Sequence, residues 1–119
     1  MDISPGDLFW ISPNETNRIA SDHIHPHVVI HVNAQSTVMV CALTSNLKRA
    51  KEPGNVLLDD GEANLAKQSV VVVSQSSTVN SSQLGAYIGT LSELRIKQVL
   101  AGMRFLQSMT QHHEKEIDP

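Results

Sequence analysis

The amino-acid sequence predicts a mainly β domain, a small curled barrel with one α-helix at its C-terminal end. Three observations support this prediction. Short segments rich in valine, isoleucine and threonine alternate with glycine, proline and asparagine turn signals along residues 6–90. A helical spacing of apolar residues follows only after that point. The length of 119 residues suits a single domain spanning 1–119, with enough chain to bury a core without disulfide bonds.

Six β-strands are predicted in order along the chain. The runs of β-branched residues place them at Gly6–Ile11, His27–Val32, Thr37–Leu43, Val56–Leu58, Ser69–Ser74 and Gln83–Thr90. The second and third should form a hairpin around a turn at Asn33–Ser36. Four consecutive valines in the fifth indicate a strand that is buried on both faces. Gly85 and Gly89 in the sixth indicate bulges or bends of a tightly curled sheet.

The segments between these strands are predicted to be loops. Ser12–Asp22 is polar and unusually long for a compact domain, which is itself a hint of function. Ala50–Asn55 contains a Pro-Gly pair and should form a second loop. One helical turn could lie around Glu62–Leu65.

The C-terminal region predicts an amphipathic helix packed on the sheet. Ser92 has the chemistry of a helix N-cap, and Glu93 is favourable in the first turn. Apolar residues follow at helical spacing at Ile96, Val99, Leu100, Met103 and Leu106. Residues 113–119 are predicted to form a frayed polar tail.

Composition and net charge limit the functional classes to which this protein can belong. The net charge is −3 with neutral histidines, so any nucleic-acid contact must come from a local patch and not from a basic surface overall. The single cysteine, Cys41, lies in an apolar run and is predicted to be a small core residue. The sequence shows neither a secretory signal nor an apolar run that could span a membrane, so a cytoplasmic protein is expected.

A cluster of histidines gives the densest functional signal. On an extended chain His23, His25, His27 and His31 could share one face. Three interpretations stay open from spacing alone. Imidazoles at short spacing suit zinc or copper, histidine also suits acid–base chemistry near neutral pH, and polar residues on a solvated strand face need no function. No cysteine lies nearby in sequence to complete a metal site.

A second signal follows the third predicted strand, where Thr44-Ser45-Asn46-Leu47-Lys48-Arg49 combines hydroxyls, an amide and two cations. This combination suits recognition of a phosphate and its flanking bases, and it is also typical of an ordinary turn. A third segment, Val73–Thr78, contains Gln75 and could donate hydrogen bonds to a ligand or simply be a polar end of a strand. The carboxylates Asp59, Asp60 and Glu62 are more typical of a solvated loop than of an acid pair.

Several segments, in order, resemble the MazF/PemK family of toxins. They are GDLFWI, VMVCALTSNLKRA, PGNVLL, GEANLAKQSVVVVSQ and LGAYIGTLSELRIKQVLAGMRFL, and together they cover most of residues 6–106. The resemblance implies an SH3-like barrel, a homodimer and cleavage of single-stranded RNA without a metal or cofactor. It also implies a 2′,3′-cyclic phosphate product and a cognate antitoxin that blocks the RNA site.

The resemblance also assigns candidate site residues. The family pairs an arginine, in an Arg-Pro motif, with a threonine or serine after the third strand. Thr44 and Ser45 match the second element, whereas His25-Pro26 replaces the Arg-Pro motif. We therefore predict His25 and Thr44 as the catalytic pair. The predicted RNA contacts are Ser45, Asn46, Lys48, Arg49, Gln75 and His27.

The histidine at position 25 leaves two functional hypotheses. An imidazole can move a proton for attack by a 2′-hydroxyl, but it does not clamp a phosphate as a permanently charged guanidinium does. The chain is thus predicted to be an endoribonuclease or, alternatively, a non-catalytic relative that binds a protein or a nucleic acid. A metal-binding histidine protein is a more distant third hypothesis.

Overall fold

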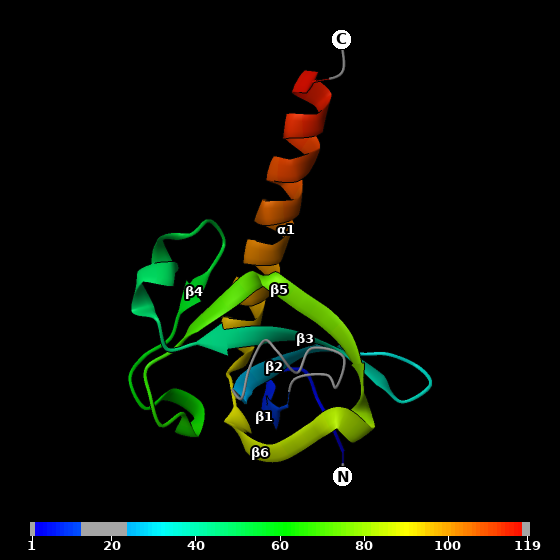
Figure 1. Ribbon diagram of the computed structural model, residues 1–119, viewed down its shortest axis with the longest axis vertical. Coiled ribbons are helices and arrows are strands. Elements are labelled where there is room, and N and C mark those ends of the chain that lie inside the picture. The colour runs from blue at the N-terminus through cyan, green and yellow to red at the C-terminus, as the bar shows by residue number, and fades with distance from the viewer. Residues whose placement is uncertain (1, 13–23, 118–119) are drawn as a thin grey trace.

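The computed structural model describes residues 2–12 and 24–117, with side chains described up to residue 110. A strongly curled antiparallel sheet forms the body, and one long helix rises from it (Figure 1). The predicted loop at Ser12–Asp22 and the predicted site residue His23 lie outside the described residues, except for Ser12.

Six strands build the sheet, and their positions confirm the predicted strands closely. They are β1 (Asp7–Ile11), β2 (His25–Val32), β3 (Thr37–Thr44), β4 (Val56–Leu57), β5 (Val70–Asn80) and β6 (Leu84–Thr90). The spatial order is β4-β5-β3-β2-β1-β6, with each neighbouring pair antiparallel. The predicted β2–β3 hairpin is therefore confirmed, and β1 joins the sheet on the other side of β2.

The sheet is curled but does not close into a barrel. Among the described residues, β4 pairs only with β5 and β6 pairs only with β1, so these two strands are the edges. The β1–β6 pairing contains two register shifts, as Gly85 and Gly89 predicted. Further shifts interrupt the β2–β3 and β3–β5 pairings, and such irregularities increase the local bend and twist of a sheet. The predicted mainly β fold with a curled sheet and a C-terminal helix is confirmed, and the structure adds that the sheet stays open at β4 and β6.

Both faces of the central strands are buried, because alternate residues belong to two apolar clusters. The larger cluster lies under the C-terminal helix and contains Leu8, Val28, Ile30, Cys41, Leu43, Leu58, Leu65, Val71, Val73, Leu91 and Val99. The smaller one contains Phe9, Ile11, Val29, Val38 and Val40. The thiol of Cys41 is fully buried, as predicted, and burial raises its pKa to about 11.

Strand β5 changes character along its length. Its first four residues, Val70–Val73, are all buried, which confirms the strand predicted from the valine run. The strand then continues to Asn80, six residues beyond the predicted end, and residues 74–78 are exposed. Serines and threonines extend this strand because they pair with β3 along Thr37–Cys41, a long-range partner that local sequence does not reveal.

Helix α1 (Glu93–Ile117) packs across the larger cluster at its N-terminal end. The Ser92 hydroxyl accepts a hydrogen bond from the Arg95 backbone N–H at 3.2 Å, which confirms the predicted N-cap. All five residues of the predicted apolar stripe pack in or against that cluster. The helix includes residues 113–117, for which the sequence predicts a frayed tail.

A close backbone approach holds α1 against the loop before β4. A Cβ atom at Gly102 would lie only 2.0 Å from the carbonyl oxygen of Gly54, so neither position has room for a larger residue. None of the helices described for this chain combines the length and apolar character that crossing a membrane requires.

Within the described residues, three short 3-10 helices lie in the connections: η2 (Leu47–Lys51), η3 (Glu62–Asn64) and η4 (Ser81–Gln83). The helical turn predicted around residue 62 is thus confirmed as η3. In contrast, η2 covers part of a region that the sequence predicts as turn and loop. The Asn46 side chain caps η2 by accepting the Lys48 backbone N–H, and this local bond favours the helical turn.

Candidate functional site: a cavity at the end of β2 and β3

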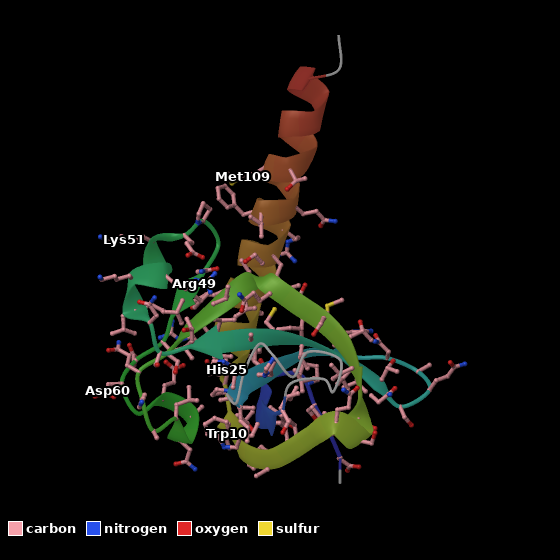
Figure 2. All side chains as sticks on the ribbon, in the orientation of Figure 1. Trp10, His25, Arg49, Lys51, Asp60 and Met109 are labelled. Atoms are coloured by element: carbon pink, nitrogen blue, oxygen red, sulfur yellow. The ribbon has the colours of Figure 1, made fainter. Side chains whose placement is uncertain are left out.

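A cavity of about 510 Å³ lies where β2 begins and β3 ends. Both predicted catalytic residues, His25 and Thr44, line it, together with Ser45. Among the described residues, the lining consists of Trp10, Ile24, His25, Pro26, Leu43, Thr44, Ser45, Asn64, Leu65, Ala66, Lys67, Ser69, Tyr87 and Ile88. Figure 2 shows Trp10 and His25 below β3 in the view, whereas Arg49 and Lys51 lie above it.

The pairing of β2 with β3 explains why His25 and Thr44 meet. The ladder ends at the pair His27–Ala42. The same register continued by two residues sets His25 opposite Thr44, and directly opposed residues of an antiparallel pair point to the same face. Two residues separated by 18 intervening positions thus reach one cavity because a single hairpin turn connects their strands.

The hydroxyl of Thr44 is held in a defined orientation. Its Oγ1 accepts the backbone N–H of Asn46 at 3.2 Å, and Thr44 itself is partly buried. A hydroxyl has one proton to donate and two lone pairs. Because Asn46 uses one lone pair, the proton is left to donate to an oxygen atom of a ligand in the cavity.

His27 lies next to the cavity but does not line it. Its Nδ1 lies 2.9 Å from the backbone oxygen of His25, and since a carbonyl only accepts, Nδ1 carries the proton. Burial lowers the pKa of His27 below its usual value, against the opposing effect of that hydrogen bond. His27 is therefore a neutral imidazole near pH 7, and its ring is fixed by the chain at His25.

The histidines within the described residues do not form a metal site. No group of three or more histidine, cysteine, aspartate or glutamate side chains in residues 2–12 and 24–110 could hold a metal ion together. His25 and His27 start β2, whereas the exposed His31 lies near its other end. The strand separates these side chains, and this arrangement gives the metal hypothesis no geometric support.

Of the predicted contacts on the turn after β3, Ser45 lines the cavity, whereas the others lie outside its lining. Asn46 caps η2, and Lys48 is exposed on it. The Arg49 guanidinium binds Glu52 through Nε and Nη2, at 2.9 and 3.0 Å. This ion pair lowers the pKa of Glu52, chiefly through the side-chain hydrogen bond. Gln75 is exposed on β5 and also lies outside the lining.

Sequence reasoning missed three residues that line the cavity. Trp10 and Tyr87 are 38% and 51% exposed, so their rings are accessible for stacking on a nucleobase. Lys67 adds the lone lysine of the lining. The signal that could have drawn attention to these rings is their scarcity, because the chain has only four aromatic residues and three of them, Trp10, Tyr87 and Phe105, are exposed.

The Tyr87 ring is positioned by contacts at both ends. Its ring packs edge-on against Phe9, with centroids 5.7 Å apart. Its hydroxyl lies 2.5 Å from Thr90 Oγ1, which in turn donates to Asp7 Oδ1 at 2.8 Å. These bonds join β6 to β1 and orient the ring before any ligand binds.

An ion pair joins η3, which lies beside the cavity, to helix α1. Arg95 of α1 donates from Nε and Nη2 to the two carboxylate oxygens of Glu62, at 2.9 and 3.0 Å. Burial by itself would raise the pKa of Glu62, but the hydrogen bonds and the charge of Arg95 outweigh it and the pKa is lowered. The carboxylate predicted to lie in a solvated loop thus joins that loop to the helix.

The chain belongs to the family of PemK-like, MazF-like toxins of type II toxin–antitoxin systems, whose family model matches residues 4–106. Among curated relatives, it is 26% identical over 98 residues to an endoribonuclease MazF of Staphylococcus saprophyticus, covering 79% of this chain and 82% of the relative. It is 28% identical over 109 residues to an endoribonuclease MazF6 of Mycobacterium tuberculosis, covering 87% and 96%.

Solved structures confirm the fold. A mycobacterial endoribonuclease in complex with its cognate antitoxin superposes with a TM-score of 0.67 at 15% identity, over 86% of this chain and 91% of that one. The Mycobacterium tuberculosis toxin MazF-mt6 superposes with a TM-score of 0.64 at 17% identity, over 82% and 91%. At these identities the likeness concerns the arrangement of the backbone.

Proposed function

We propose that this chain is an endoribonuclease that cleaves single-stranded RNA without a metal ion or cofactor. One observation carries the proposal: His25 and Thr44, from different strands, line the same cavity. Family membership supplies the reaction class, since curated relatives of the chain are endoribonucleases. The aromatic side chains of Trp10 and Tyr87 at the same cavity suit single-stranded RNA, whose unstacked bases bind to exposed rings.

The chemistry assigned to the pair is attack within the RNA itself. The 2′-hydroxyl oxygen forms a bond to the adjacent phosphorus, and the bond from phosphorus to the 5′-oxygen breaks. The products are a 2′,3′-cyclic phosphate and a 5′-hydroxyl. His25 takes the proton of the 2′-hydroxyl or returns one to the leaving 5′-oxygen. Thr44 donates its hydroxyl proton to an oxygen of the phosphate as charge develops.

The other predicted contacts are expected to contribute to RNA binding to different degrees. Ser45 lines the cavity and hydrogen-bonds the nucleotide there. Asn46, Lys48, Arg49, Gln75 and His27 would contact RNA that extends beyond the cavity. Arg49 must share its guanidinium with Glu52, so its contribution to RNA binding is expected to be small.

Partners and location belong to the same proposal. A solved structure that shares this fold is bound to its cognate antitoxin, and we expect an antitoxin that covers the cavity of this chain. A homodimer and a cytoplasmic location are expected from the family.

Cleavage of a long single-stranded RNA in the presence of EDTA tests the proposed function. Wild-type protein should cleave, and His25→Ala or Thr44→Ala should each slow cleavage about 100-fold or more, the usual contribution of such groups. Both positions are at strand ends, so thermal unfolding should show folded variants. Lys97→Gln, an exposed change on α1, is the matched control that keeps full activity.

Two outcomes would contradict the proposal. Wild-type protein that cleaves no RNA and causes no growth arrest on expression would favour the non-catalytic relative. Cleavage that persists in both alanine variants would place the reaction elsewhere on the chain.

A further inference from the structure

The cavity is cationic although the chain as a whole is acidic. Among the lining residues that the structure describes, the ionisable side chains are His25, Lys67 and Tyr87, and none is an aspartate or glutamate. The whole chain has a net charge of −3. Such a lining favours an anionic ligand, because the positive charge attracts the anion and no described lining residue carries a negative charge that would repel it.

The other lysines and arginines with described side chains are either in ion pairs or absent from the cavity lining. Arg49 is paired with Glu52, and Arg95 is paired with Glu62 and Asp59. The lysines and arginines with described side chains that take part in no such pair, other than Lys67, do not line the cavity: Lys48, Lys51, Lys97 and Arg104. Lys67 is exposed, and within residues 2–12 and 24–110 its ammonium takes part in no ion pair.

The backbone that presents Lys67 is anchored on both sides. On the N-terminal side, Leu65 is buried in the larger apolar cluster. On the C-terminal side, the hydroxyl of buried Ser69 donates to the Lys67 carbonyl oxygen at 2.9 Å. The Gln68 side chain donates to the Leu58 carbonyl at 2.9 Å, and Leu58 N–H donates to the Ser69 carbonyl at 3.0 Å. The loop therefore holds the lysine at a fixed place beside the cavity while its ammonium stays accessible.

The proposed reaction needs a permanent positive charge at this place. A phosphodiester carries one negative charge, and attack by the 2′-hydroxyl adds charge to the phosphate oxygens. A threonine is neutral, and histidine as a residue type loses its charge near neutral pH. A lysine ammonium keeps its charge there and acts as a compact point charge with three donors.

We infer that Lys67 is the phosphate-binding cation of this site, and that its ammonium contacts the non-bridging oxygens of the phosphodiester held against His25 and Thr44. The inference rests on the proposed function. It adds a charged contact to the site, from the loop between η3 and β5. This loop belongs neither to the histidine cluster nor to the polar turn after β3.

The test compares Lys67→Gln, which removes the charge, with Lys67→Arg, which keeps it. Lys97→Gln again removes an exposed lysine that is not part of the cavity lining and is the matched control. Binding is measured by fluorescence anisotropy with a short random-sequence pool of single-stranded RNA in which every ribose is 2′-O-methylated, so that no nucleophile is present. Cleavage of an unmodified long RNA is measured in parallel, and thermal unfolding checks that each variant is folded.

Lys67→Gln should weaken binding and slow cleavage about tenfold. The slope of log affinity against log salt should become shallower by about 0.7, the value for one lost phosphate contact on a single strand. Lys67→Arg should restore the slope and most of the rate, and Lys97→Gln should match wild type. A purely structural role for Lys67 would lower the unfolding temperature and leave the salt slope unchanged.

The two assays separate this inference from the proposed function. Cleavage by wild type with an unchanged rate and salt slope in Lys67→Gln overturns the role of Lys67 and leaves the nuclease intact. Salt-dependent binding that is lost in Lys67→Gln, without cleavage by wild type, supports the phosphate contact and overturns the nuclease. A wild-type protein that neither binds nor cleaves overturns both.

Discussion

Two basic segments flank the end of β3, and they differ in what they can contribute to the cavity. The 3-10 helix η2 follows β3 directly and carries Lys48, Arg49 and Lys51. The loop before β5 carries Lys67 alone. From the sequence, η2 is the stronger candidate for binding RNA. In the structure none of its residues lines the cavity, and its arginine is paired with Glu52, whereas Lys67 lines the cavity and has no ion-pair partner within residues 2–12 and 24–110.

Strand pairing explains this difference. Thr44 at the end of β3 is paired with Val70 at the start of β5, so the chain that enters β5 lies beside the site. Lys67 precedes Val70 by three residues and is therefore close to Thr44 in space. The chain that leaves β3 instead turns into η2, which packs near β4 and β5. Proximity to the cavity thus depends on which strands pair and not on which residues are neighbours in the sequence.

Beyond the catalytic and Lys67 variants, the largest loss of RNA affinity is expected when an aromatic ring of the cavity lining is removed. Trp10→Ala should weaken binding of 2′-O-methylated single-stranded RNA by roughly fivefold to 100-fold, since one base stacked on a ring contributes about 1–3 kcal/mol. Phe105→Ala removes an aromatic ring that is also exposed but lies on α1, and it should leave affinity unchanged. Equal losses in both variants would mean that binding does not involve the cavity.

A smaller effect is expected on η2. Arg49→Gln should weaken RNA binding by about twofold, because the guanidinium lies outside the lining and its charge is shared with Glu52. The same anisotropy assay measures the RNA affinity of Arg49→Gln and of Lys67→Gln in parallel. If Arg49→Gln proved as damaging as Lys67→Gln, the distinction between the two basic segments would be wrong, and the RNA would have to cross η2 closely.

The smallest expected effect is a pH dependence of stability that originates at His27. Burial lowers its pKa in the folded state below the unfolded value of about 6.5. The unfolded chain then binds the proton more readily, so His27 contributes stability above about pH 6.5, and this contribution is lost as the pH falls through that value toward the lowered pKa.

Urea unfolding at about pH 7.5 and about pH 5.5 measures this loss. The unfolding midpoint of His27→Gln should fall less between the two values than that of wild type. His31→Gln removes an exposed imidazole near the other end of β2 and should fall as much as wild type does. A wild-type midpoint that rises on acidification would contradict the neutral state of His27.

Much of the fold could be predicted from local patterns. The valine run at Val70–Val73, the hairpin around Asn33–Ser36 and the capped helix from Glu93 each depend on residues close together in the sequence. The end of β5 could not be predicted, because its exposed polar residues are held by pairing with β3. Which strands form the open edges of the sheet could not be predicted for the same reason, since the strand order depends on contacts between strands far apart along the chain.

For the site, the sequence by itself supplied the candidate pair, because its resemblance to the MazF/PemK family assigns His25 and Thr44, whose catalytic role stays a prediction. Only the tertiary structure decided which other residues share their cavity. Three further segments supply Lys67, Trp10 and Tyr87 to the lining. Arg49 lies outside the lining and forms an ion pair with Glu52. The physical reason is that residue type and spacing act locally, whereas the curl of the sheet and the pairing of β5 with β3 bring distant residues together.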